Sequence, residues 1–100
     1  MSTDRKIDLG RFSHQKSYVC IHVFRHERPV LLVDRSGGDW CFLCGDAHPQ
    51  DPAFGRVVGM GHVIEHDPSL RDVLDLEPEW EAERTEIGGP WVRQPVPLSD

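Results

Sequence analysis

The amino-acid sequence predicts an α+β domain, with a mostly antiparallel sheet of about four or five strands and two short helices on one face. Two patterns support this prediction. Apolar side chains alternate through residues 18–24 and 79–84, as in half-buried strands, whereas residues 60–74 repeat apolar side chains at helical spacing. Strand-like segments come before and after the helical segment instead of alternating with helices, which favours an antiparallel sheet.

The chain divides into three predicted parts. Its 100 residues are the length of one domain, and a hydrophobic content of 38% suffices for one modest core. Residues 1–17 are polar and aperiodic, so we expect a flexible N-terminal arm. The α+β domain is expected over residues 18–92, followed by an extended tail over residues 93–100, which include Pro95 and Pro97.

The first three predicted strands lie at residues 18–24, 30–33 and 40–44. The first alternates and is rich in β-branched residues, and the second is apolar on both faces, as in a central strand. Gly37 and Gly38 supply the positive φ angles of a hairpin turn between the second and third strands. We therefore expect an antiparallel meander in which the three strands lie side by side in sequence order.

A surface loop is expected over residues 45–55, and the apolar pair at residues 57–58 is too short to predict an element. Two helices follow, and the second is expected to begin with Asp67 as its N-cap and Pro68 in its first turn. The apolar stripes of the two helices are Met60, Val63 and Ile64, then Leu70, Val73 and Leu74.

A late strand is expected over residues 79–84, with Trp80 and Ala82 facing inward and glutamates facing outward. A turn at residues 88–90 follows, after which Trp91 is expected to pair only briefly with the sheet. Trp91 lies beside this turn and a basic residue, so we expect it to be exposed and to serve as a binding anchor.

Acidic residues are concentrated in one segment. The whole chain carries a net charge of −6, whereas residues 65–86 hold nine acidic residues and only two arginines, a net charge of −7. Such a field repels phosphate backbones and attracts basic surfaces, so we expect a basic protein partner and no nucleic acid. The alternative is a solvated face that keeps the protein soluble. The predicted binding residues are Glu77, Glu79, Glu81, Glu83 and Trp91.

The Cys-x-x-Cys-Gly motif at residues 41–45 permits two interpretations. A strand would send Cys41 and Cys44 to opposite faces, and the large side chains of Phe42 and Leu43 between them favour this interpretation, with packed thiols and no bound metal or cofactor. A tight turn would instead form half of a zinc site, because two histidines one helical turn apart follow later in the chain. The ligands of this alternative, a small structural zinc module, are Cys41, Cys44, His62 and His66.

No other pattern indicates catalysis, and we expect a non-enzymatic protein. Cys20 and His22 share a strand face but have no third group to orient them, and no glycine-rich phosphate loop is present. The odd count of 3 cysteines and the absence of an apolar leader favour the cytoplasm, and no stretch approaches the roughly 18 apolar residues of a membrane span. The sequence leaves the oligomeric state open.

Three short segments, in this order, carry a family resemblance: GDWCF at residues 38–42, VIEHDPSL at residues 63–70 and WEAER at residues 80–84. Together they resemble a group of small bacterial proteins, some of which resemble the immunity proteins of polymorphic toxin systems. The resemblance implies a protein-interaction domain that binds and neutralises a toxin. The pattern does not depend on the cysteines, so it adds nothing to the zinc alternative.

Overall fold

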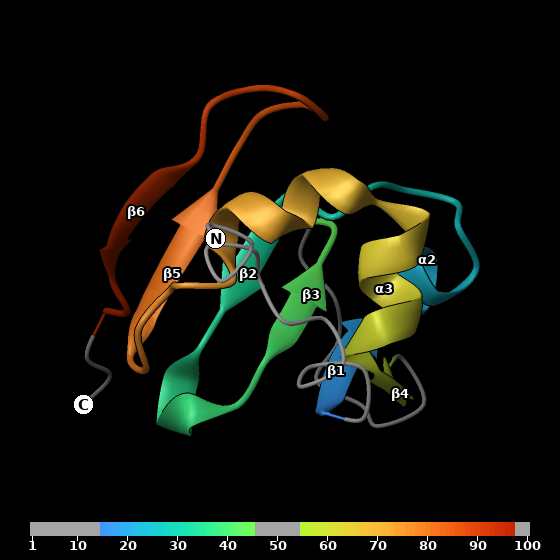
Figure 1. The fold of residues 1–100 in the computed structure, drawn as a ribbon, viewed down its shortest axis with the longest axis horizontal. Helices are drawn as coiled ribbons and strands as arrows, with labels where there is room; N and C mark the ends of the chain where they lie inside the picture. The colour runs from blue at the N-terminus through green and yellow to red at the C-terminus, as the bar shows by residue number, and fades with distance from the viewer. Residues whose placement is uncertain (1–14, 46–54, 98–100) are drawn as a thin grey trace, which may run out of the picture.

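The computed structural model describes residues 15–45 and 55–97 of the chain. These residues form a six-stranded mixed sheet with helices packed on it, which confirms the α+β prediction with six strands instead of the four or five expected (Figure 1). The strands are β1 (Lys16–Cys20), β2 (Leu32–Asp34), β3 (Cys41–Leu43), β4 (Gly55–Gly59), β5 (Trp80–Glu83) and β6 (Val92–Pro95). The helices are α2 (Ile21–Phe24), α3 (Met60–His66) and the 3-10 helices η2 (Ser36–Gly38) and η4 (Pro68–Val73).

The strand order is β4-β1-β3-β2-β5-β6, and every neighbouring pair is antiparallel except β1 and β3, which run parallel. The predicted hairpin of β2 and β3 is confirmed. The predicted meander is wrong, because β2 lies on the far side of β3 instead of between β1 and β3. The chain reaches β2 from β1 through α2 and a long connection, and this crossover leaves room for β3 beside β1.

The predicted strand over residues 18–24 begins earlier and ends earlier in the structure. Strand β1 starts at Lys16 and stops at Cys20, and the next four residues form the single helical turn α2. The backbone N–H of Arg25 donates to the carbonyl oxygen of Ile21 at 3.0 Å, which closes this turn. Alternation of apolar residues could not reveal the turn, since Ile21 and Val23 are buried in either conformation.

The two edge strands of the sheet, β4 and β6, are longer than the sequence predicted. The apolar pair at residues 57–58 belongs to β4, which pairs along the whole of β1, from Lys16 opposite Gly59 to Cys20 opposite Gly55. Strand β6 continues to Pro95, so the first three residues of the predicted tail are part of the sheet. Most of the predicted arm, the predicted loop from residue 46 to residue 54 and the last three residues lie outside the described residues.

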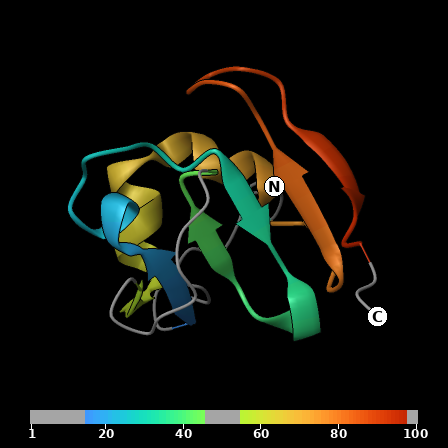
Figure 2. The same cartoon turned by 180° about the vertical axis from the view of Figure 1, so that it is seen from behind.

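The core lies between the sheet and one layer of helices. Helices α3 and η4 cross one face of the sheet, while in the opposite view no described helix crosses β2, β3 and β5 (Figures 1 and 2). A row of side chains in register across four strands faces the helices, and these are at most 1% exposed: Val19, Phe42, Val33 and Ala82. The predicted helical stripes cover this row, and all six of their residues are buried. Burial of each large side chain in such a core contributes about 1.5–3 kcal/mol.

A buried arginine joins the helical layer to the sheet. The side chain of Arg84 is fully buried, and its Nε and Nη2 atoms donate to the carbonyl oxygen of Val30 at 3.1 and 3.0 Å. Its Nη1 donates to Ser69 Oγ at 2.7 Å, and its Nη2 forms a 2.7 Å salt bridge with Asp67. Asp67 also accepts from the backbone N–H of Ser69, which confirms it as the cap of η4. The Arg84 guanidinium thus connects the end of β5, the segment before β2 and the start of η4.

We expect Arg84→Ala to lower the free energy of unfolding by about 3–5 kcal/mol, because it leaves the Asp67 carboxylate and the Val30 carbonyl without their partner. The matched control is Arg93→Ala, since Arg93 pairs with Asp75 at 2.9 Å on the surface. Loss of that exposed pair should cost at most about 1 kcal/mol. Urea unfolding of both variants measures the difference, and equal losses would contradict this account of Arg84.

Candidate functional site

The parallel pairing of β1 and β3 brings a sulfur and imidazole cluster together. Parallel neighbours end at the same edge of a sheet, so Cys20, the last residue of β1, lies close to Cys44, which follows the last residue of β3. The turn of α2 begins directly after Cys20 and carries His22 back towards the same place. Three elements therefore contribute one side chain each.

The cluster has the dimensions of a metal site. One ligand atom from each of Cys20, His22 and Cys44 lies within 4.8 Å of the other two, and Cys44 Sγ lies 3.8 Å from His22 Nδ1. Ligand atoms around a tetrahedral zinc ion, with bonds of about 2.3 Å to sulfur and 2.0 Å to nitrogen, lie roughly 3.5–3.8 Å apart. Only small side-chain movements separate the observed arrangement from that geometry. Both cysteines are buried and His22 is half-buried, so the site is shielded from bulk water.

Burial raises the pKa of Cys20, and hydrogen bonds to the backbone of Val23 and Cys44 offset this only in part. A raised pKa keeps the thiol neutral, whereas a catalytic cysteine requires a lowered pKa and partial exposure. The environment of Cys20 thus disfavours a free nucleophile. A bound cation reverses this preference, because a coordinating thiol loses its proton to the metal.

The predicted zinc ligands do not converge. Residues 41–43 form a strand, as the first interpretation predicted, and the alternation along it sends Cys41 to the face opposite that of Phe42. The ring of His66 lies against that of His26, with ring centroids 3.8 Å apart and the planes tilted by 32°. Of the four predicted ligands, only Cys44 belongs to a cluster of three or more metal-binding side chains among the described residues. The zinc alternative is therefore wrong in its ligand set.

The predicted acidic binding residues lie on and before β5, and two of them have structural roles. Glu79 Oε2 accepts from the backbone N–H of Gly37 at 2.8 Å, and Glu81 Oε2 accepts from Gln94 Nε2 at 2.5 Å. Glu77 and Glu83 are exposed, and their carboxylates make no hydrogen bond or ion pair with other described residues. These two glutamates are the part of the predicted set that remains available to a partner.

Trp91 is half-buried instead of exposed. The guanidinium of Arg84 lies over its ring, 4.3 Å from the centroid. Its indole Nε1 is buried and has no hydrogen-bond partner among the described residues. The ring of Trp91 therefore packs against Arg84 of the same chain, which leaves less of the ring available to a partner than the sequence predicted.

Comparisons with protein-family models, with curated proteins and with solved structures find no match for this chain. The resemblance to immunity proteins therefore stays a prediction. Among the described residues, no helix has both the length and the apolar character needed to cross a bilayer.

Cys41, the third thiol, is expected to affect the stability of the fold at alkaline pH. Burial, followed by the charges of Asp34 and Asp39, raises the pKa of Cys41 from 9.0 to about 11. Because the folded-state pKa lies above the unfolded value, Cys41 stabilises the fold below about pH 9, and this contribution disappears as the pH rises through 11. We expect Cys41→Ala to lose less stability than the parent protein between pH 8.5 and about 11 in urea unfolding. Identical pH profiles for the two proteins would contradict this.

Proposed function

We propose that this protein is a small metal-stabilised domain that binds one zinc-type ion through Cys20, His22 and Cys44. The convergence of their three ligand atoms within 4.8 Å carries the proposal. Thiolate and imidazole ligands select zinc over magnesium or calcium, which prefer oxygen. Three protein ligands leave the fourth position of a tetrahedral ion to water or to another donor.

A structural role fits the position of the cluster. The three ligands lie at the end of β1, on α2 and directly after β3. One ion would therefore join α2, where the crossover from β1 to β2 begins, to β3, which lies between those two strands in the sheet. Domains of this size have modest cores, and a metal that binds only the folded state adds its binding free energy to stability. The three cysteines form no disulfide, which agrees with a reducing compartment such as the cytoplasm.

Elemental analysis of the reduced, purified protein is expected to find one zinc per chain, and cobalt substitution should produce the intense absorption of thiolate-to-cobalt charge transfer. Cys20→Ser, His22→Ala and Cys44→Ser should each weaken binding by roughly 100-fold, since each removes one of a few ligands that share the binding free energy. The matched controls, Cys41→Ser and His62→Ala, should bind as the parent protein does.

The two control variants distinguish the ligand sets. Loss of metal in Cys41→Ser or His62→Ala would support the ligands expected from the sequence and overturn the set proposed here. A reduced protein that binds neither zinc nor cobalt would overturn the metal function altogether.

We propose, as a second function, a non-enzymatic interaction between the acidic surface around β5 and a basic protein. The carboxylates of Glu77 and Glu83 support it, since both residues are exposed and neither carboxylate has a partner among the described residues, as does the net charge of −7 over residues 65–86. The resemblance to immunity proteins suggests a toxin-like partner. Association through such a surface is accelerated by charge and weakened by salt. The two proposals are compatible, because the metal centre lies on α2 and the ends of β1 and β3, away from β5 in the strand order.

Binding to basic proteins encoded beside the gene tests this second function. We expect Glu83→Lys to slow association roughly tenfold at low salt and much less at high salt, since salt screens exposed charges. Glu27→Lys makes the same change of charge on the loop after α2 and should have little effect. The absence of a basic partner at either salt concentration, or an equal effect of both reversals, would count against the acidic surface.

A further inference from the structure

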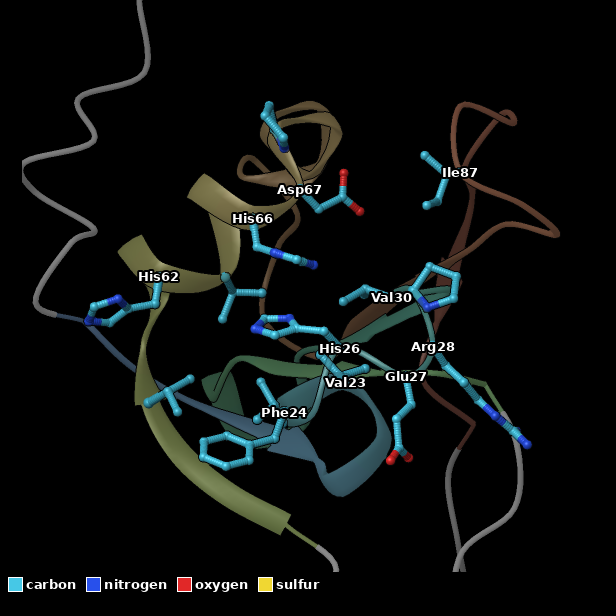
Figure 3. Close-up of a pocket in the computed structure, with 15 residues that line it drawn as sticks. Val23, Phe24, His26, Glu27, Arg28, Val30, His62, His66, Asp67 and Ile87 are labelled. Carbon is cyan, nitrogen blue, oxygen red and sulfur yellow. The ribbon is translucent and has the colours of Figure 1, made fainter.

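A pocket of about 660 Å³ lies between α3 and the connection from α2 to β2 (Figure 3). Its volume is within the range of about 300–1,000 Å³ that small-molecule sites occupy. Most of its wall is apolar, and the aliphatic side chains that line it are Val19, Val23, Val30, Val58, Val63 and Ile87. None of the three proposed metal ligands lines the pocket, so the two sites share no side chain.

Three imidazoles supply the polar part of the pocket. His62 and His66 come from α3, and His26 comes from the loop that follows α2. The rings of His26 and His66 stand face to face, with centroids 3.8 Å apart and planes tilted by 32°. The backbone of His26 has a φ of 60°, a left-handed conformation that few residues other than glycine adopt. Figure 3 shows the ring of His26 directed towards α3 and His66.

The other charged groups around the pocket are engaged or directed away. Asp67 accepts from Ser69 with one carboxylate oxygen and from Arg84 with the other. Figure 3 shows the side chains of Glu27 and Arg28 directed away from the histidine pair. By contrast, the ring nitrogens of the three histidines make no hydrogen bond with other described residues. Among the described residues that line the pocket, His26 and His66 therefore have hydrogen-bonding capacity left for a ligand.

We propose that this pocket binds a small aliphatic monocarboxylate. Its hydrocarbon body would lie against the valine-rich wall, and its carboxylate would accept hydrogen bonds from His26 and His66. A carboxylate suits this pair because its two oxygens can each accept a hydrogen bond from one of the two rings. An ammonium group would need an anionic acceptor, but the Asp67 carboxylate already pairs with Arg84, and the Glu27 carboxylate is directed away from the histidine pair (Figure 3).

Octanoate is a suitable probe, with octanol and octylamine as probes of equal chain length and different head groups. We expect saturable binding of one octanoate per chain with a Kd on the order of 0.1–1 mM, as suits a ligand of this size. Octanol and octylamine should bind at least about tenfold more weakly, because neither has the negatively charged acceptor oxygens to which the imidazoles would donate. Isothermal titration measures the affinities, and the methyl resonances of Val30, Val63 and Ile87 should shift on binding.

Two exposed variants locate the head group. His66→Ala should weaken octanoate binding about tenfold and leave octanol binding unchanged, since only the carboxylate uses the ring. Glu65→Ala, the neighbouring exposed position on α3 outside the pocket, should leave both affinities unchanged.

Three results would overturn the proposal: no saturable binding of octanoate, equal affinities for the three probes, or an unchanged octanoate affinity in His66→Ala. Octanoate binding that requires zinc beyond the one ion per chain proposed for Cys20, His22 and Cys44 would assign the histidine pair to a metal and overturn it as well. Each titration is run on the parent protein and on the Cys44→Ser variant, which lacks one proposed metal ligand but keeps every residue that lines the pocket, so equal octanoate affinities separate this pocket from the metal centre.

Discussion

The parallel pairing of β1 with β3 is the constraint on which the rest of the structure depends. Its register, Val19 opposite Phe42, begins the buried row that continues through Val33 and Ala82 and faces the helices. The same pairing places the ends of both strands at one edge, where Cys20 and Cys44 meet. Because β2 lies beyond β3, the chain must cross from β1 to β2, and that crossover carries His22 into the cluster and His26 into the pocket.

Local signals in the sequence identified what is local in the structure. The stripes of α3 and η4, the Asp67 cap, the hairpin of β2 and β3 and the extended backbone through Cys41 were all predicted, since each depends on a few neighbouring residues. The order of the strands depends on contacts far apart in the chain, and no short motif encodes it. In a meander, β2 would separate Cys20 from Cys44 by two strand spacings, about 9.6 Å, instead of one. The metal centre was missed for this reason, although Cys20, His22 and Cys44 were each noted in the sequence.

The acidic segment illustrates a second limit of composition. Its formal charge of −7 counts every carboxylate alike, whereas the structure gives several of them internal partners. Asp67 neutralises the buried Arg84, Asp75 pairs with Arg93, and Glu79 and Glu81 accept hydrogen bonds that hold η2 and β6 against β5. Glu81 and Glu83 lie two residues apart on β5 and share a face of the sheet. Glu81 accepts a hydrogen bond from Gln94, whereas Glu83 has no partner among the described residues. Sequence spacing alone could not separate the structural carboxylates from the available ones.

The position of β6 has a consequence for contacts between copies of the protein. This strand is exposed along its whole length and forms one border of the sheet that the described residues build, and the backbone of such a border strand invites a further strand. Pro95 lacks an N–H group, and Arg93 places a cation on the same short strand. Such features discourage strand addition, so this border of the sheet resists growth into edge-to-edge aggregates even where the protein is abundant.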